Sequence, residues 1–289
     1  MGEVPTIWEK ISALDKRILY WALFLSLIIP YLRPLGLPLS IAETTYAVYN
    51  FINKLGPEHT VVVGIHSGVS AWPECLPGLV VVTKHLVQRG VKLIFWSIGY
   101  VDVDLTMDAI KTRVPQLKGP GEIAGPGDYK YGINWVYMGY IAGGEPTSAQ
   151  LADDIRAVLR ADKYGNLIDT LPIFSNVRNA RDIALVVTSD TGDYGWYYVR
   201  QWTMRYGTPV AEIGIAMIYS EFMPYYRAGL AIGMLKGVRG AAEYEKLTGF
   251  LGEATVAMDA MNISHILTIL AIIIANISYF MTRRKGGAK

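Results

Sequence analysis

Two apolar runs lie near the ends of the chain, and each predicts one membrane-spanning helix. The first extends from Ile18 to Leu32, and the prolines and glycine of the next segment, Arg33 to Leu39, oppose a helix and indicate an extended exit from the bilayer. The second extends from Ile263 to Met281 and stops at the basic cluster Arg283-Arg284-Lys285. Eighteen or more apolar residues followed by basic charge are typical of a transmembrane helix rather than a buried core helix.

The first run is short, and a cleaved signal peptide is the competing interpretation. Its residues would extend about 22 Å as a helix, against a hydrocarbon core of roughly 30 Å. No small-x-small cleavage site follows the run. We therefore interpret residues 18–39 as a first transmembrane helix with its extended exit.

The basic residues beside the runs predict the orientation of the chain. Lys10, Lys16 and Arg17 precede the first run, and the basic tail 282–289 follows the second, whereas the intervening side carries only Arg33 close to a span. By the positive-inside rule, both termini are cytoplasmic in the cell membrane and the region between the spans is extracytoplasmic.

The N-terminal tail, residues 1–17, has the pattern of a short amphipathic helix. Thr6 and Glu9 fit a capping box, and apolar residues recur on one helical face after it. The basic residues of the tail suit anionic headgroups, so we expect membrane lipid as a partner on the cytoplasmic face.

Residues 40–252 alternate between β-rich apolar runs and segments with helical periodicity. The expected strands are residues 60–65, 91–98, 133–140, 183–188 and 210–218. Helical patterns separate them, at residues 42–55, 76–88, 147–159 and 196–206. Continuous apolar strands alternating with helices predict a doubly wound, mostly parallel, Rossmann-like α/β domain flanked by the transmembrane helices. Residues 253–262 are then a linker.

Composition agrees with membrane insertion and excludes one class of partner. The chain of 289 residues is 52% hydrophobic and 18% charged, an apolar excess that two spans explain. Its 27 basic and 25 acidic residues nearly cancel, and basic residues run together only at the C-terminus, so we expect no nucleic-acid binding. The one cysteine, Cys75, excludes an intramolecular disulfide.

Polar residues follow the expected strands, at the edge where open parallel sheets bind ligands. The ligand-binding candidates are His66, Ser67, Ser70, Asp102, Asp104, Ser189, Asp190 and Asp193. Any such fold has polar loops at this edge, so the set marks the edge and does not by itself define an active site.

Known catalytic and cofactor-binding motifs are not matched in this sequence. In Gly64-Ile65-His66-Ser67-Gly68 the serine stands one place late for a nucleophile elbow, and Asp190-Thr191-Gly192 matches the aspartic-protease triplet in the wrong structural context. The pair Asp102 and Asp104 is explained more simply by helix capping than by a bound cation. Neither dinucleotide-binding nor P-loop glycine patterns occur, and the histidines lack zinc spacing. We expect no cofactor and no metal.

Small residues in the spans predict helix association. Ala22 and Ser26 in the first span, and Ala271 and Ala275 in the second, form small-xxx-small pairs, and Asn276 places an amide within the second span. An amide is costly in lipid, so we expect it to bond a neighbouring helix and the chain to form a homo-oligomer.

Three classes of function remain open. The first is a membrane-anchored, self-associating binding or scaffold protein, which accounts for the anchors and the missing catalytic signatures. The second is an extracytoplasmic hydrolase or transferase that uses the strand-end residues. The third is a subunit of a larger membrane complex whose other membrane subunits supply the chemistry. We favour the first, and the convergence of the strand-end candidates on one pocket would favour the second.

Overall fold

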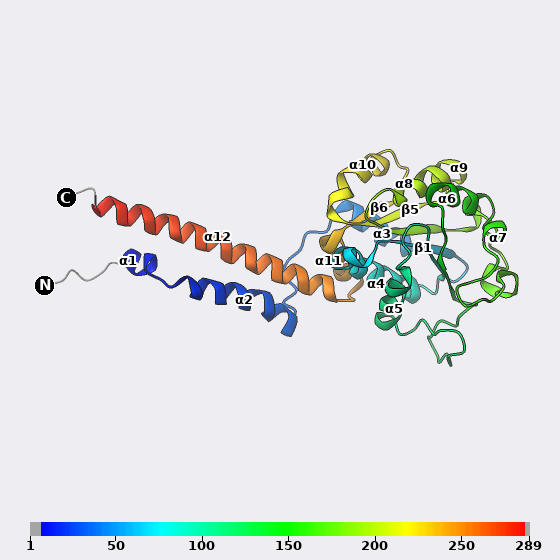
Figure 1. The fold of residues 1–289 in the computed structure, drawn as a ribbon, viewed down its shortest axis with the longest axis horizontal. Coiled ribbons are helices and arrows are strands. Elements are labelled where there is room, and N and C mark those ends of the chain that lie inside the picture. Colours follow the sequence, from blue (N-terminus) through cyan, green and yellow to red (C-terminus); the bar gives the residue numbers. More distant parts are fainter. Residues whose placement is uncertain (1–6, 287–289) are drawn as a thin grey trace. The chain divides into compact units, whose positions relative to one another are not determined.

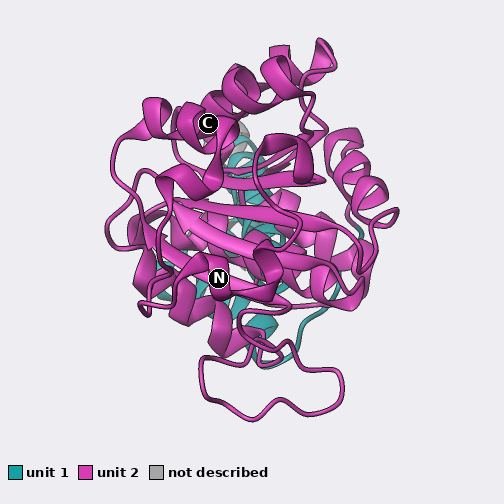
Figure 2. Cartoon of the chain, turned by 90° about the vertical axis from the view of Figure 1, so that its right-hand side faces the viewer, with its two compact units in different colours: residues 1–38, 255–289 teal, residues 39–254 magenta. Residues whose placement is uncertain are grey.

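The computed structural model describes residues 7–286, so Thr6 of the expected capping box lies outside the described residues. The chain divides into two compact units, coloured separately in Figure 2. Residues 39–254 form one unit, and residues 1–38 together with 255–289 form the other.

The unit of residues 39–254 contains a six-stranded sheet in which all pairs are parallel. The strands are β1 (Thr60–His66), β2 (Lys92–Ser97), β3 (Trp135–Tyr140), β4 (Leu185–Asp190), β5 (Val210–Gly214) and β6 (Gly233–Lys236). Their order is β3-β2-β1-β4-β5-β6, so the direction of winding reverses between β1 and β4. This order is that of the Rossmann fold, and the expected α/β class is confirmed.

Helices cover both faces of the sheet, as Figure 1 shows. One face carries α3 (Glu43–Ile52), α4 (Trp72–Gln88), α5 (Val103–Arg113) and α11 (Gly237–Thr248). The other carries α6 (Gly144–Asp153), α7 (Ile155–Val158), α8 (Tyr194–Tyr198), α9 (Met204–Tyr206) and α10 (Tyr219–Arg227). A π-helical turn, Val199–Thr203, joins α8 to α9. Short 3-10 turns occur at Val69–Ala71, Ile168–Thr170, Pro172–Phe174, Ala180–Asp182 and Ala216–Ile218.

The strands are buried on both faces, which explains their continuous apolar sequence. Val61 and Val63 belong to the core beneath α4, whereas Val62 belongs to the core on the opposite face. Successive side chains alternate between the faces of a strand, so each strand contributes to both cores.

Two details differ from the pattern-based prediction. The helix expected to start at a Thr147 cap begins earlier, at Gly144, and breaks at Asp154. The Asp154 carboxylate accepts the N–H groups of Arg156 and Ala157 and so starts α7. The short strand β6 was not predicted, because four residues are too few to show a periodic pattern.

Both ends of the unit of residues 39–254 are bonded to α11. Lys246 donates to the carbonyl of Leu39 at 3.2 Å, and Glu243 accepts the N–H of Ala42 at 3.0 Å. At the other end, Glu245 accepts the N–H of Ala254 at 3.1 Å. The polypeptide therefore enters and leaves this unit along one helix.

The second unit contains α1 (Ile7–Ser12), α2 (Lys16–Leu32) and the greater part of α12 (Glu253–Gly286). Within the described residues, one helical stretch, Glu253–Arg283, is long and apolar enough to span a membrane. The helix α2 coincides with the first expected span but has only 17 residues. Residues 253–262, interpreted above as a linker, are helical and continue into the second expected span.

Candidate functional site

The reversal of winding places β1 and β4 side by side, and ligands of this fold class bind in the crevice outside their carboxyl ends. The loop after β1 starts at Ser67, and the loop after β4 starts at Thr191. The predicted site residues lie at the ends of these strands, on the loops that follow them, or after β2, where Asp104 stands in the first turn of α5.

Two tyrosine rings of the protein itself lie over the loops outside these strand ends. The Tyr100 hydroxyl lies 2.6 Å from Oγ1 of Thr191, which joins the loops after β2 and β4 across β1. The Tyr100 ring lies over Gly68, where an added Cβ would come within 3.0 Å of the ring. The Tyr194 ring lies over Gly99 in the same way, and a Cβ there would come within 2.2 Å. The two rings therefore cover part of the edge outside β1 and β4.

His66 is held in place by buried hydrogen bonds and by a stacked ring. Its Nδ1 accepts the N–H of Ile98 at 3.3 Å, so Nε2 carries the proton and donates to the Tyr198 hydroxyl at 3.1 Å. Trp96 donates to the same hydroxyl at 2.7 Å, and the Tyr194 ring stacks on the imidazole. Complete burial lowers the pKa of His66 to about 3, so the ring stays neutral at physiological pH.

Ser67 is separated from His66 by the sheet itself. Its Oγ lies 2.9 Å from Oγ of Ser189, and both serines are fully buried. Ser189 precedes Asp190 on β4, and successive side chains of a strand point to opposite faces. Since Asp190 is the register partner of His66, the paired serines and the imidazole lie on opposite faces. His66 therefore cannot act as a base for either serine.

Asp190 organises the loop that follows β4. Its carboxylate accepts the N–H groups of Gly192 at 2.8 Å and Gly195 at 2.7 Å, at the start of α8. Burial raises the pKa of Asp190 to about 6, although these N–H groups oppose the rise. The buried Asp190 carboxylate thus caps the N-terminus of α8.

The two aspartates beyond β2 do not form a joint site. Asp102 accepts the N–H of Val69 at 3.0 Å. Asp104 accepts the Tyr137 hydroxyl and the Lys163 ammonium, each at 2.6 Å. The two carboxylates thus bind different elements.

The two remaining candidates, Ser70 and Asp193, are exposed at the edge. Among the described residues, no group of three or more His, Cys, Asp or Glu side chains is placed to hold a metal ion. The structure thus brings together Ser67 with Ser189, and leaves the other candidates in separate contacts.

The sequence did not predict the buried carboxyl group of Glu212. Glu212 lies on β5, and neither of its carboxyl oxygens has a hydrogen-bond partner in the described part of the chain. Oγ1 of Thr188, its register partner on β4, is also buried without a partner. Burial, followed by the charge of Asp190, raises the pKa of Glu212 well above its usual value. The only signal in the sequence is one acid within an apolar strand.

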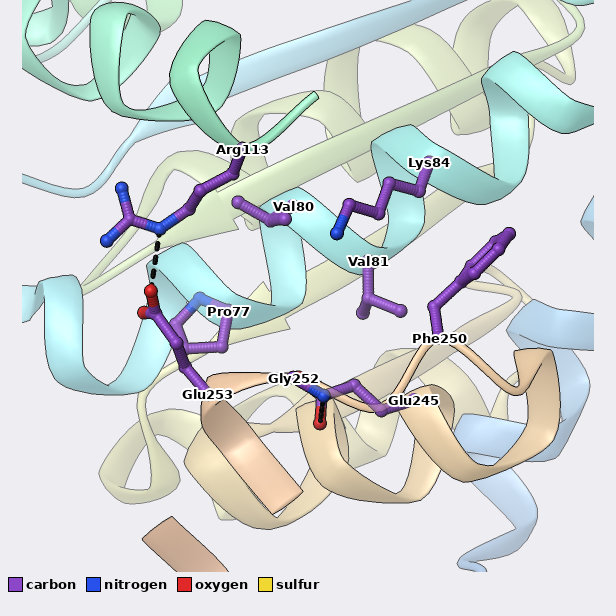
Figure 3. Close-up of a pocket in the computed structure, with 9 residues that line it drawn as sticks. All are labelled: Pro77, Val80, Val81, Lys84, Arg113, Glu245, Phe250, Gly252 and Glu253. Carbon is purple, nitrogen blue, oxygen red and sulfur yellow. Dashed lines mark hydrogen bonds and ion pairs between the residues drawn. The ribbon is translucent and has the colours of Figure 1, made fainter. Parts of the chain in front are cut away.

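A small pocket beside the start of α12 is shown in Figure 3. It is lined by Pro77, Val80, Val81, Lys84, Arg113, Glu245, Phe250, Gly252 and Glu253. Its volume is about 80 Å³, and Arg113 is paired with Glu253 at 2.8 Å. Small-molecule sites usually occupy roughly 300–1,000 Å³, so this pocket is too small for one.

Comparison of the chain with protein-family models, with curated proteins and with solved structures gave no match. The fold and the site together define a Rossmann-like α/β domain in which two tyrosine rings lie over the loops at the usual ligand-binding edge.

Proposed function

We propose that the protein is a membrane-anchored, self-associating binding or scaffold protein. In this proposal the spans at residues 18–39 and 263–281 hold an extracytoplasmic α/β domain, with both termini in the cytoplasm. The observation that carries the choice against a serine-based enzyme is the placement of His66 and Ser67 on opposite faces of the sheet. A hydrolase or transferase that uses a serine nucleophile needs a base within hydrogen-bond reach of that serine.

The carboxyl edge of the sheet supports binding of a protein surface. Three apolar side chains at or beyond the ends of different strands of this edge are exposed: Val101 by 73%, Tyr140 by 41% and Met217 by 76%. We call them the apolar rim. Apolar and aromatic side chains surrounded by polar residues are typical of protein interfaces. A second copy of the chain or another membrane subunit would cover them.

The second span supports association within the membrane. Asn276 donates its amide to the carbonyl of Ile272, one turn earlier, at 2.9 Å. Its side-chain oxygen therefore remains as an acceptor for a neighbouring helix, and Ala271 and Ala275 permit close approach. Interhelical polar contacts contribute only about 0.6–2 kcal/mol each, so the rim and the spans would act together.

The native mass of the protein in mild detergent tests self-association. We expect an oligomer, weakened by Ala271→Leu with Ala275→Leu and weakened further by Val101→Ser with Met217→Ser. The matched control is Ile269→Leu, which keeps the volume of an exposed span residue. A monomer at micromolar concentration contradicts self-association and favours a subunit that awaits a different partner.

The exposed glycine- and proline-rich loop 118–128 allows a test of orientation. Cys75 is fully buried, so Ala124→Cys supplies the one accessible thiol. We expect this cysteine to react with a membrane-impermeant thiol reagent on intact cells. Labelling that occurs only after lysis places the α/β domain in the cytoplasm instead.

A further inference from the structure

A polar cavity of about 330 Å³ lies at the C-terminal ends of α3, α4 and α11, away from the strand-end crevice. It is lined by Tyr49, Asn53, His85, Gln88, Arg89 and Thr248. Its volume falls within the range of small-ligand sites, and no acidic side chain lines it. None of these residues was singled out by the sequence motifs.

Neighbouring residues hold the back of the cavity in place. His85 is buried, its Nδ1 accepts the Tyr244 hydroxyl at 2.8 Å, and its Nε2–H donates to Oδ1 of Asn53 at 3.2 Å. The Tyr49 ring stacks on the imidazole at 5.2 Å. Burial, followed by the charge of Arg89, lowers the pKa of His85 to about 4. The imidazole is thus a neutral support that fixes the Asn53 amide.

Hydrogen-bond donors without protein partners line the cavity. Arg89 uses Nε to donate to the carbonyl of Leu55 at 3.1 Å, which fixes the guanidinium group. Its two terminal nitrogens, the NH₂ groups of Asn53 and Gln88, and the Tyr49 hydroxyl make no hydrogen bond within residues 7–286. The guanidinium group beside amide donors can bond a pair of oxygens of a carboxylate or a phosphate.

We propose that this cavity binds a small oxyanion, a carboxylate or phosphate group, through the guanidinium of Arg89 and the amides of Asn53 and Gln88. The carbonyl ends of three helices disfavour an anion, because the helix dipole is negative there. The positive charge of Arg89 must offset this unfavourable dipole. Loss of that charge should therefore weaken anion binding more than the loss of one arginine would at a site on a helix N-terminus. The proposal is independent of the function proposed above.

The thermal midpoint of the full chain in an uncharged detergent tests the site, with inorganic phosphate and acetate as probes against chloride at equal ionic strength. Bound anion stabilises the folded state by mass action, so we expect at least one probe to raise the midpoint. Arg89→Gln should weaken the response about tenfold in anion concentration, the loss of about one charge-assisted contact. Arg89→Lys keeps the charge but loses the paired terminal nitrogens. Its response to the anion should be weaker than that of the unmodified chain and stronger than that of Arg89→Gln.

Two further variants separate a bound anion from a general salt effect. Arg227→Gln removes an exposed arginine from the last turn of α10 and should respond as the unmodified chain does. Asn53→Asp keeps the acceptor for His85 and should abolish the response by repulsion. A response to phosphate alone assigns a phosphate group, and a response to both probes assigns oxyanions generally. No rise over chloride, or an equal rise in Arg89→Gln, overturns the proposal, since excluded anions stabilise every variant alike.

Discussion

The carboxylate of Asp259 accepts the backbone N–H of Gly36 at 2.8 Å. The same carboxylate accepts the N–H groups of Leu35 at 2.8 Å and Leu37 at 2.9 Å. Asp259 is buried, and Gly36 has a φ of +61°, a conformation that favours glycine. One side chain of α12 thus fixes the extended segment that follows α2.

Replacement of Asp259 by alanine should free this segment. Three N–H groups lose a charged acceptor, so the free energy of local opening should fall by about 2–3 kcal/mol. Exchange of the amides of residues 35–37 with deuterium should accelerate about 30- to 150-fold. Asp108→Ala, at an exposed aspartate on α5, is the matched control. Unchanged exchange in Asp259→Ala contradicts the contact.

Glu212→Gln should change how stability depends on pH. A carboxyl group whose pKa is raised on folding stabilises the fold below its unfolded pKa, near 4.5, and that stability is lost as pH rises through the folded pKa. The thermal midpoint of Glu212→Gln should therefore exceed that of the unmodified chain by more at pH 8 than at pH 5. Glu221→Gln, at an exposed glutamate of α10, serves as the control. Parallel curves for the unmodified chain and Glu212→Gln would falsify the assignment.

The serine pair should show strong coupling in a double-mutant cycle. Ser67→Ala leaves the buried hydroxyl of Ser189 unpaired, and Ser189→Ala leaves that of Ser67 with Cys75 as its partner; each should cost about 1–2 kcal/mol in the free energy of unfolding. The double replacement should cost little more than either single one, because no unpaired partner remains. Additive losses in denaturant titrations would show that the two hydroxyls do not bond each other.

Tyr100→Phe should loosen the connection between the loops after β2 and β4 without removing the ring. The bond to Thr191 is lost, and a partly buried hydrogen bond of this kind contributes about 1 kcal/mol. Deuterium exchange of the Gly192 amide should accelerate about fivefold. Tyr140→Phe, at an exposed tyrosine of the same edge, is the control and should leave that amide unchanged.

The sheet was predictable from sequence because its strands carry their pattern locally. Runs such as Val61 to Ile65 are apolar at every position, and this pattern is specific to strands buried on both faces. Helix ends were less predictable, since the break at Asp154 depends on one side chain folding back onto two N–H groups. The strand β6 draws its stability from α3 and β5 rather than from its own sequence.

The candidate site was predictable in position but not in its chemistry. The end of each strand identified the edge where His66 and Asp190 lie. The partners of His66 and Ser67 are distant in sequence: Tyr198 for His66, and Ser189 for Ser67. The rings of Tyr100 and Tyr194 can lie where they do only because Gly68 and Gly99 leave room for them, a relationship that becomes visible only in three dimensions.

The attachment of both ends of the α/β unit to α11 determines how it would bear mechanical force. Tension applied through Leu39 and through Ala254 reaches Lys246 and Glu245, which are adjacent residues of the same helix. The load would pass across one turn of α11 and bypass the hydrogen bonds between the strands. The sheet, with the strand-end side chains it positions, would keep its geometry while its attachment is pulled.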